Sequence, residues 1–485
     1  MRNFSPQRAC TRSSMLGAGV CAALLTGCSM IPTYERPHAP VPVQWPGSAG
    51  IAADALASVS PADVPWQDFV GDQRLRQLVA MALDENRDLR VATLAIEQAR
   101  AQYQIRRADR TPTLNAAASA TRQPAADGSG DSTTLYSVGL AVASWEIDFF
   151  GRVASLQEAA LDQYLATQEG RNAAQTSLVA AVASTWLSVQ ADDALLDLTQ
   201  QTLATRNDSL RLTQLRFDQG VSSALDMRQA ESLTAAARAA LAQQKRLRAL
   251  DVNALSLLVG APVPTELLPS AQEPVQVFSP LPGGLPSELL TRRPDVLQAE
   301  RQLMASNANI GAARAAFFPR IALTASAGTA STALSGLFSS GSFGLTLAPQ
   351  ALLPIFDAGR NQANLESTQV ARKIAVAQYE KTVQTAFREV ADALASRAAL
   401  VDQLQATQAQ ATAEADRFRL ADLRYKNGIA SYLDVLDAQR ALFATQQAVA
   451  QIALAQQQNE VALYRALGGG WQTPAFASAR AAAPE

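Results

Sequence analysis

Histidine and cysteine, the side chains that catalysis and metal binding use most often, are almost missing from this sequence. It has one histidine, His38, and three cysteines among 485 residues. His38 lies in a proline-rich stretch without a second ligand beside it, and a metal site needs several ligands. Cys10 and Cys21 lie in a segment that we expect to be removed, so Cys28 alone remains and no intrachain disulfide can form. We therefore expect no catalytic site, no metal site, no cofactor and no enzyme activity.

Long apolar runs are also missing beyond residue 27. No later stretch approaches the ~18 consecutive apolar residues that a transmembrane helix needs. A chain of this kind can cross a membrane only as a barrel, because backbone polar groups must pair with one another inside the hydrocarbon. The sequence also has no excess of positive charge, because it contains 41 basic and 43 acidic residues. This balance argues against a nucleic-acid partner.

The N-terminal segment 1–27 has the features of a signal peptide. Arginines precede a short apolar run over 15–26, which is typical of a secretory h-region. The run ends in Leu25–Cys28, which resembles a bacterial lipobox, so we expect Cys28 to be lipidated and to become the mature N-terminus. Ser29 follows the cysteine, which in lipoproteins generally implies sorting to the outer membrane. An ordinary signal peptide with a chance cysteine remains the alternative, and residues 28–65 are expected to form a proline-rich, lipidated tether.

The chain contains an internal repeat with an offset of 208 residues. LRFDQGVSSALDMRQ at 215–229 aligns without a gap with LRYKNGIASYLDVLD at 423–437, and the aligned glycines are Gly220 and Gly428. The offset is too long for a solenoid unit and indicates a duplicated half-protein. We expect the parts of the chain to be a first repeat at 66–270, a second repeat at 271–470 and a disordered tail at 471–485.

Each repeat is expected to hold a helix, a β-hairpin and a helical hairpin. Side chains alternate with a period of two in 112–148 and 319–355, which predicts strands with unlike faces. Proline-free windows rich in good helix formers follow and are expected to reverse at Gly220 and Gly428. An apolar seven-residue repeat in these windows indicates a left-handed supercoil. Taken alone, the strand pattern also fits a soluble hairpin, and the seven-residue repeat also fits an ordinary core stripe.

Helix lengths predict how the parts of a repeat lie beside one another. The outward arm of each helical hairpin is longer than its return arm, and the shorter helix before the strands makes up the difference. We therefore expect the shorter helix and the return arm to stack end to end beside the outward arm. Four strands cannot close a barrel, for which ~8 is about the smallest number. Open edges are not tolerated in lipid, so copies of the chain must pool their strands.

Several features together resemble the TolC-like outer membrane factor family, within it the lipoprotein (OprM/NodT) branch of efflux outer membrane subunits. They are the duplicated halves, FGR and AGR after the strands, RRPD at 292–295 and GIASYLDVLDAQR at 428–440. The resemblance spans residues 28–470 and implies an α+β membrane protein. It implies a homotrimer with four transmembrane β-strands per chain in a 12-stranded β-barrel and a long periplasmic α-helical barrel.

The resemblance also implies a function and a set of partners. The chain would be the outer membrane channel of a tripartite efflux pump, a duct that exports drugs or other small solutes. It would be lipid-anchored in the outer membrane, with a large periplasmic part. The implied partners are a periplasmic membrane fusion (adaptor) protein, an inner-membrane resistance-nodulation-division pump and outer membrane lipid. The alternatives are an exit duct for type I protein secretion and a lipid-anchored trimeric coiled-coil scaffold without a pore.

The second turn carries the candidate periplasmic gate. Asp434 and Asp437 are three residues apart and share a helix face, so a trimer would hold two rings of carboxylates, which favour cations. In the resemblance they match the pore-constricting aspartates, and Tyr425 matches a tyrosine that helps hold the closed state. TolC itself carries an arginine two residues after the turn glycine, whereas this sequence has Ala430 there, with Arg424 and Lys426 nearby, so the closing contacts are expected to be rearranged. The alternative for Asp434 is helix capping, as for Asp226 in the first repeat.

Overall fold

A computed structural model describes residues 29–42, 64–124, 132–269, 278 and 292–471 of the chain. The expected signal peptide, Cys28 and nearly all of the expected tail lie outside these residues. Within them, no helix is both long and apolar enough to cross a membrane. The chain divides into two compact units. The sheet unit contains the described parts of Met1–His38, Ala95–Thr167 and Gln298–Glu380, and the hairpin unit contains the remainder.

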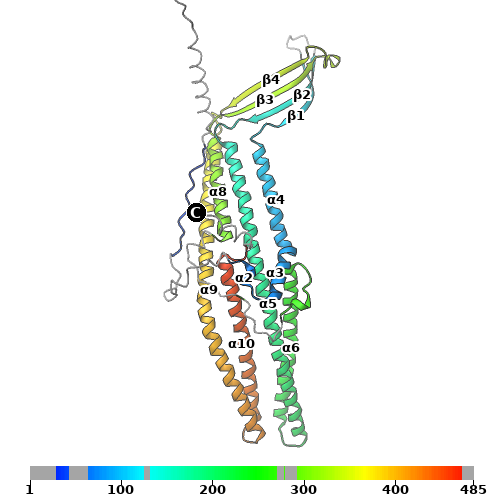
Figure 1. Cartoon of the computed structure of the whole chain (residues 1–485), viewed down its shortest axis with the longest axis vertical. Helices are drawn as coiled ribbons and strands as arrows, with labels where there is room; N and C mark the ends of the chain where they lie inside the picture. The colour runs from blue at the N-terminus through cyan, green and yellow to red at the C-terminus, as the bar shows by residue number, and fades with distance from the viewer. Residues whose placement is uncertain (1–28, 43–63, 125–131, 270–277, 279–291, 472–485) are drawn as a thin grey trace, which may run out of the picture. The chain divides into compact units, whose positions relative to one another are not determined.

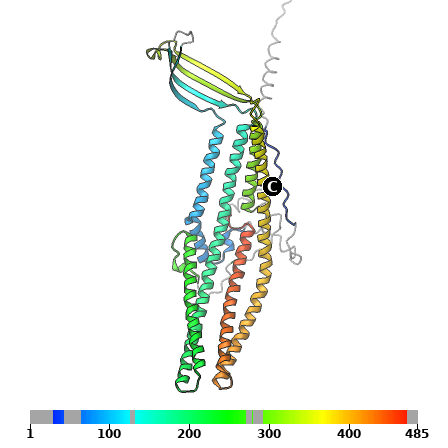
Figure 2. The ribbon, with the colours of Figure 1, turned by 180° about the vertical axis from the view of Figure 1, so that it is seen from behind.

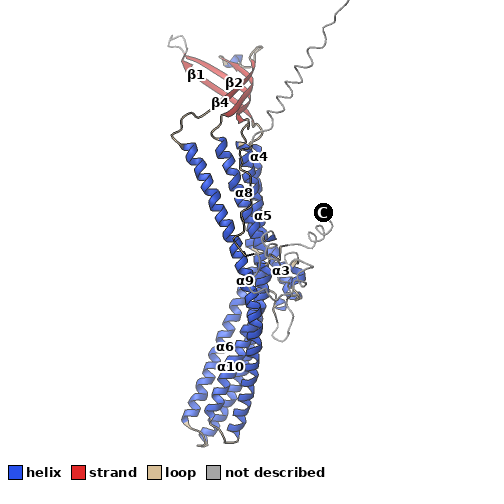
Figure 3. Ribbon diagram, turned by 90° about the vertical axis from the view of Figure 1, so that its left-hand side faces the viewer, coloured by secondary structure: helices blue, strands red, loops and turns tan. Residues whose placement is uncertain are grey.

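The sheet unit contains a four-stranded antiparallel sheet (Figure 1). Its strands are β1 (Leu114–Pro124), β2 (Ser132–Glu146), β3 (Arg320–Ser331) and β4 (Phe343–Leu352). They lie in the order β1-β2-β3-β4, so the pairing of β2 with β3 joins the strands of the two repeats. Figure 3 shows these strands gathered at one place, with helices making up most of the described chain. The expectation of an α+β protein with long helices and a few antiparallel strands is confirmed.

The two faces of this sheet differ in chemistry. Phe343, Leu345 and Leu347 of β4 alternate along one face and are 64–74% exposed in the single chain. Their register partners are Thr329, Ala327 and Ala325 of β3. The opposite face carries small and polar side chains, among them Ser119 and Ser137, whose hydroxyl oxygens lie 2.8 Å apart. The sheet therefore has an apolar surface that no described residue covers and a polar surface behind it.

Two helices of equal length continue from the strands. They are α5 (Arg152–Asp218) and α9 (Arg360–Lys426), each of 67 residues, or about 100 Å at ~1.5 Å per residue. Each contributes its first part to the sheet unit and the rest to the hairpin unit. The return helices are α6 (Ala224–Val259) and α10 (Tyr432–Ala466). Figures 1 and 2 both show α5 beside α6 and α9 beside α10, with the two turns at the same end of the hairpin unit.

The shorter helices α4 (Arg87–Ala108) and α8 (Pro294–Ala315) begin where the return helices end. Ahead of α4, the Asn86 amide donates to the carbonyl of Leu258 in α6 at 2.8 Å. Ahead of α8, Arg293 donates to the carbonyl of Ala466 in α10 at 2.7 Å. Both contacts satisfy carbonyls that a helix C-terminus leaves unpaired. Within the hairpin unit, a polar side chain thus joins the residue ahead of each shorter helix to the end of the return helix, as the predicted end-to-end arrangement requires.

The main apolar core of the hairpin unit surrounds the short helices α2 (Trp66–Phe69) and α3 (Gln73–Glu85). The Phe69 ring stacks on Tyr464 of α10, with ring centroids 3.9 Å apart, and on Phe278 at 4.7 Å. Trp186 of α5 is fully buried in the same cluster. This core fixes the helices at one end of the hairpin unit, away from the turns. The remaining short elements are the 3-10 turns Thr265–Leu267 in the hairpin unit and Leu334–Gly336 in the sheet unit.

Candidate functional site

The helix reversals at Gly220 and Gly428 have the same backbone geometry. Their φ angles are 71° and 73°, in the left-handed region that favours glycine. In the second turn, the amide of Gly428 donates to Tyr425 at 3.0 Å and the amide of Ile429 donates to Arg424 at 2.9 Å. The first turn repeats this pattern of bonds. The pattern is that of a Schellman motif, which pairs the last carbonyls of a helix.

The return helices begin differently after these turns. In α6, the Ser223 hydroxyl accepts from the amide of Asp226 at 3.1 Å, and the Asp226 carboxylate accepts from the amide of Ser223 at 3.2 Å. These two bonds form a capping box. In α10, Asp434 accepts from the Ser431 hydroxyl at 3.2 Å, and Ser431 makes no side-chain cap to the backbone. Asp226 therefore caps α6 through a capping box, whereas Asp434 and Ser431 form no capping box at the start of α10.

Asp437, the second candidate gate residue, forms an ion pair with Arg417 of α9. Arg417 also pairs with Glu414 at 3.1 Å. The Asp437 side chain is 61% exposed, so water screens this pair and its net strength is small. The pair nevertheless places a cation beside one of the two aspartates. In an assembly of several copies, Asp434 would then contribute more of the net negative charge than Asp437.

Tyr425 connects the second helical hairpin to the first. Its ring lies 5.2 Å from the ring of Tyr432, with an angle of 42° between the planes. The guanidinium of Arg216, in the last turn of α5, lies over the Tyr425 ring at 4.7 Å. Tyr432 is buried, and its hydroxyl contacts Thr213 and Ser209 of α5, while burial raises its pKa. The two tyrosines thus bring α9 and α10 into contact with α5 at the turn end.

An apolar cluster beneath these rings includes side chains from the return helices. Leu233 of α6 packs with Val435 and Leu436 of α10, and Leu436 is 1% exposed. Phe418 of α9 and Leu210 of α5 pack against the cluster. All four helices therefore meet in one small core close to the candidate gate. A displacement of one hairpin against the other would expose the side chains of this core.

Sequence reasoning missed Arg216, Arg417 and Tyr432. For Arg216 the sequence held a partial signal, because basic side chains are favoured near the negative end of a helix, its C-terminus. Arg216 lies in the last turn of α5, where such a residue is expected. Nothing in the spacing predicts that its guanidinium stacks on a ring from another helix. Arg417 lies 20 positions before Asp437, and only the geometry of the hairpin brings them together.

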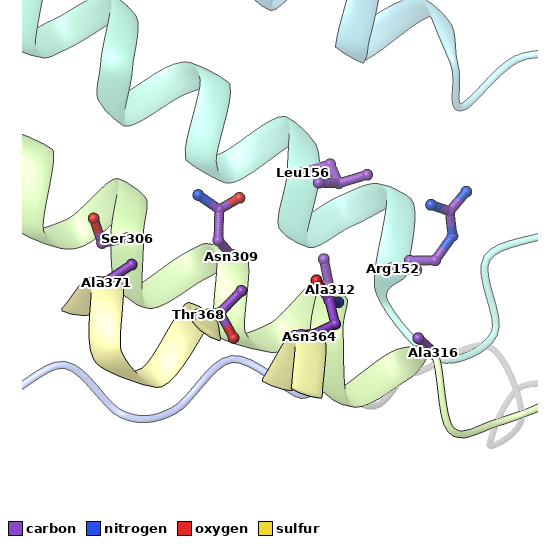
Figure 4. A pocket seen from close by; sticks show the side chains of 10 residues that line it. Arg152, Leu156, Ser306, Asn309, Ala312, Ala316, Asn364, Thr368 and Ala371 are labelled. Carbon is purple, nitrogen blue, oxygen red and sulfur yellow. The ribbon is translucent and has the colours of Figure 1, made fainter. Parts of the chain in front are cut away.

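The sheet unit contains a cavity of about 380 Å³ between α5, α8 and α9 (Figure 4). Figure 4 shows Asn309 and Ser306 on α8 and Thr368 and Asn364 on α9, with alanines between them. Arg152 lies at one end and is held by two bonds to Glu146, at 2.8 and 2.6 Å. The lining offers amide and hydroxyl groups but no nucleophile beside a base. Within the described ranges, no cluster of three or more histidine, cysteine or acidic residues could hold a metal ion.

The described start of the chain lies along α8 in the sheet unit, and we call residues 29–38 the strap. The Asn307 amide of α8 donates to the carbonyl of Pro32 at 2.7 Å. Ile31 lies over Gly311, where a Cβ would approach its Cγ1 to 2.6 Å. The strap is therefore docked by specific contacts. Near the end of α8 that leads to the sheet, Arg314 donates to the carbonyl of Met30 at 3.4 Å.

Two segments of the chain, 78–261 and 285–469, match the family model described as outer membrane efflux protein. The probable efflux pump outer membrane protein TtgC of Pseudomonas putida is 46% identical over 463 residues, which cover 94% of this chain and 96% of the relative. Outer membrane protein OprJ of Pseudomonas aeruginosa is 46% identical over 467 residues, with coverages of 94% and 96%. The open-state structure of the Neisseria gonorrhoeae MtrE outer membrane channel superposes with a TM-score of 0.83 at 40% identity. The superposition covers 92% of this chain and 99% of the MtrE chain.

Proposed function

The chain belongs to the outer membrane efflux protein family, and we propose that it forms the outer membrane channel of a tripartite efflux pump. The observation that carries this proposal is the 46–47% identity, over nearly the whole chain, to relatives named as efflux pump outer membrane proteins. Their location in the outer membrane applies to this chain as well. The cargo we propose is drugs or other small solutes, since the relatives' names refer to antibiotics, toluene and solvents.

The channel is proposed to be a homotrimer. In the sheet, β1 and β4 are edge strands whose outer sides have no partner strand among the described residues. A hydrocarbon environment requires every such edge to be paired. Three copies would join β4 of one chain to β1 of the next and close twelve strands into a ring. The exposed apolar face of Phe343, Leu345 and Leu347 supports contact with lipid on the outside of that ring.

The proposed partners are a periplasmic adaptor protein and an inner-membrane resistance-nodulation-division pump. The turns of the helical hairpins support a docking surface for the adaptor, because apolar side chains are exposed there. Val221 and Leu225 are 77% and 66% exposed in the first turn, and Ile429 and Leu433 are 69% and 54% exposed in the second. Such side chains become buried when another helical protein packs against them.

The proposed periplasmic gate consists of Asp434, Asp437 and Tyr425. Asp434 and Asp437 lie on one face of α10, and Tyr425 lies in the contact that holds the two helical hairpins together. A charged residue at a narrow point of a duct attracts ions of opposite sign and slows their exit. Cys28 is proposed to carry the lipid anchor. The docked strap supports this role, because Ile31 and Pro32, a few residues after Cys28, lie against α8.

Single-channel recording of the purified protein in a planar bilayer tests both the channel and the gate. The wild-type protein should conduct ions, and the double variant Asp434→Ala with Asp437→Ala should conduct better because the carboxylate rings are gone. Asp208→Ala is the matched control, since this exposed aspartate lies on α5 and pairs with Arg211. A protein without conductance would refute the channel and favour a scaffold. Conductance that is equal in the double variant and the wild type would refute the gate alone.

A further inference from the structure

A partly buried polar layer interrupts the seam between α5 and α6. The buried side chains of α6 on either side of it are mainly apolar, with Ala230, Leu233 and Ala237 beside Thr234 toward the turn and Leu255 and Val259 toward the other end. Between them stand Gln244, Arg248 and Asp251, at helical spacing on one side of α6. The opposing residues on α5 are Asp192 and Asp193.

This layer contains more carboxylates than cations. Arg248 pairs with Asp193 through two bonds, the longer of them 3.3 Å. Gln244 donates to one carboxylate oxygen of Asp192 at 2.7 Å. The other oxygen of Asp192 is buried and accepts no hydrogen bond from the part of the chain that the structure describes, and the residue as a whole is 8% exposed. Asp251 of α6 lies within hydrogen-bonding range of Asp192.

Two ionised carboxylates at this range repel each other, and a proton between them relieves the repulsion. Like charges at close range raise the pKa of one member of the pair, as in other carboxylate dyads. An unpaired buried carboxylate oxygen also retains its desolvation cost. One proton held between Asp192 and Asp251 removes both penalties, because it cancels one charge and supplies the missing donor.

We propose that Asp192 and Asp251 form a proton-binding pair that ties α6 to α5 when a single proton bridges the two carboxyl groups. The pair makes the first helical hairpin more stable against opening at low pH and less stable at high pH. If the proposed function holds, this hairpin lies in the periplasm, and its stability therefore depends on the periplasmic pH.

The charges around the pair set the direction of this effect. Burial first, and then Asp251, raise the pKa of Asp192 to about 6, and burial also raises the pKa of Asp251. Asp193 on the same helix acts in the same direction on Asp192, and Arg248 from α6 is held by Asp193. The folded hairpin therefore binds more protons than the unfolded chain between pH ~4 and pH ~6. Its stability is highest on the acid side and falls as the pH rises through the pKa of Asp192.

The second hairpin supplies an internal control. At the offset of 208 residues, Asp192 and Asp193 are replaced by Leu400 and Val401, and Asp251 is replaced by Asn459. The Asn459 amide donates to the carbonyl of Ala393 at 2.9 Å. No carboxyl pair stands at this position in the second hairpin, so its stability should not change across the same pH range.

Hydrogen–deuterium exchange on the full-length protein in detergent tests the proposal. Exchange is compared at pH ~5 and pH ~8, under conditions where protection reports the opening equilibrium, with correction for the intrinsic rate. A pKa raised from about 4 to about 6 gives roughly tenfold greater protection at the lower pH for peptides covering 189–196 and 244–255. Peptides covering 397–404 and 452–463 should show no such change.

Three substitutions separate proton binding from ordinary packing. Asp192→Asn keeps the shape, removes the charge and supplies a donor, so protection should be high and equal at both pH values. Asp251→Asn should act in the same way from the other helix. Asp193→Asn should lower protection at both pH values, because Arg248 loses its partner, while the tenfold pH difference remains. A pH difference that persists in Asp192→Asn and Asp251→Asn, or that appears equally in the second hairpin, overturns the proposal. These outcomes are independent of conductance, so the channel function stands or falls separately.

Discussion

Replacement of Glu300 by glutamine should release the strap from α8. Glu300 is 5% exposed and accepts three hydrogen bonds from the strap. The Tyr34 hydroxyl donates at 3.0 Å, and Arg36 donates from two nitrogens at 2.7 and 2.8 Å. Burial, reinforced by the Glu300 carboxylate, raises the pKa of Tyr34, so its hydroxyl stays protonated and can donate. Glutamine keeps the shape of the side chain but loses the charge and one acceptor oxygen.

The size of the effect follows from these contacts. Hydrogen bonds to a charged group contribute about 1.5–3 kcal/mol each, whereas exposed ion pairs contribute only about 0–1 kcal/mol. The Arg36 side chain is 50% exposed, so solvent weakens its two bonds. A total loss of about 2 kcal/mol is expected. At ~1.4 kcal/mol per factor of ten, this loss makes the undocked strap about 30-fold more populated.

Chymotrypsin cleavage after Tyr34 measures the undocked population, because a protease needs an extended segment that is free of its neighbours. When the strap opens and closes faster than the protease cuts, the cleavage rate follows the open fraction. Cleavage should therefore be about 30-fold faster in Glu300→Gln than in the wild type, because the undocked strap is about 30-fold more populated. Trypsin is unsuitable, because Pro37 follows Arg36.

The neighbouring residue provides the control. Arg301 pairs with Asp162 of α5 at 3.4 Å and makes no bond to the strap. Arg301→Gln should leave cleavage after Tyr34 unchanged. Arg36→Gln should accelerate cleavage, and its combination with Glu300→Gln should add little, because the two residues share one interaction. Equal cleavage of wild type and Glu300→Gln, or equal acceleration by Arg301→Gln, would show that these bonds do not hold the strap.

Two further outcomes are expected. Arg216→Ala removes the cation over the Tyr425 ring, a contact of about 1 kcal/mol, so the open fraction of the channel in planar bilayers should rise about fivefold. Arg216→Lys should retain most of the wild-type behaviour, and an unchanged open fraction in Arg216→Ala would remove this contact from the closed state. Cys28→Ser should lower the mass of the mature protein by the mass of the lipid while the trimer still assembles, because the strands anchor it independently. A mass that shows no loss of lipid would contradict the lipobox.

Much of the fold could be predicted because its signals are local. A glycine between two helical windows predicts a reversal, since few other residues adopt a positive φ. The alternation within 319–355 predicts a strand with one apolar face, and the shorter strand β4 has that face exposed. The contact between Asn86, ahead of α4, and the end of α6 agrees with a prediction made from lengths alone, because a helix advances by a constant ~1.5 Å per residue.

The partners of individual side chains were not predictable in the same way. The sequence predicts that Asp434 and Asp437 share a helix face, but it does not predict that Arg417 pairs with Asp437. The contact of Arg216 with Tyr425 joins two repeats that lie more than two hundred positions apart. Such pairs depend on the rotation of each helix about its axis. That rotation is decided by packing across the whole hairpin rather than by any short window.

The sequence by itself determined the duplication, the turn glycines, the helical and strand segments and the family, because each of these is written in residues close together or repeated at a constant offset. Only the tertiary structure decided which face of each helix meets which neighbour. It placed the strap on α8 through Glu300, brought Tyr425 beneath Arg216, and set Asp192 opposite Asp251. The physical reason is that side chains interact over a few ångströms, whereas the residues that make these contacts are brought together only when long helices fold back at their turns.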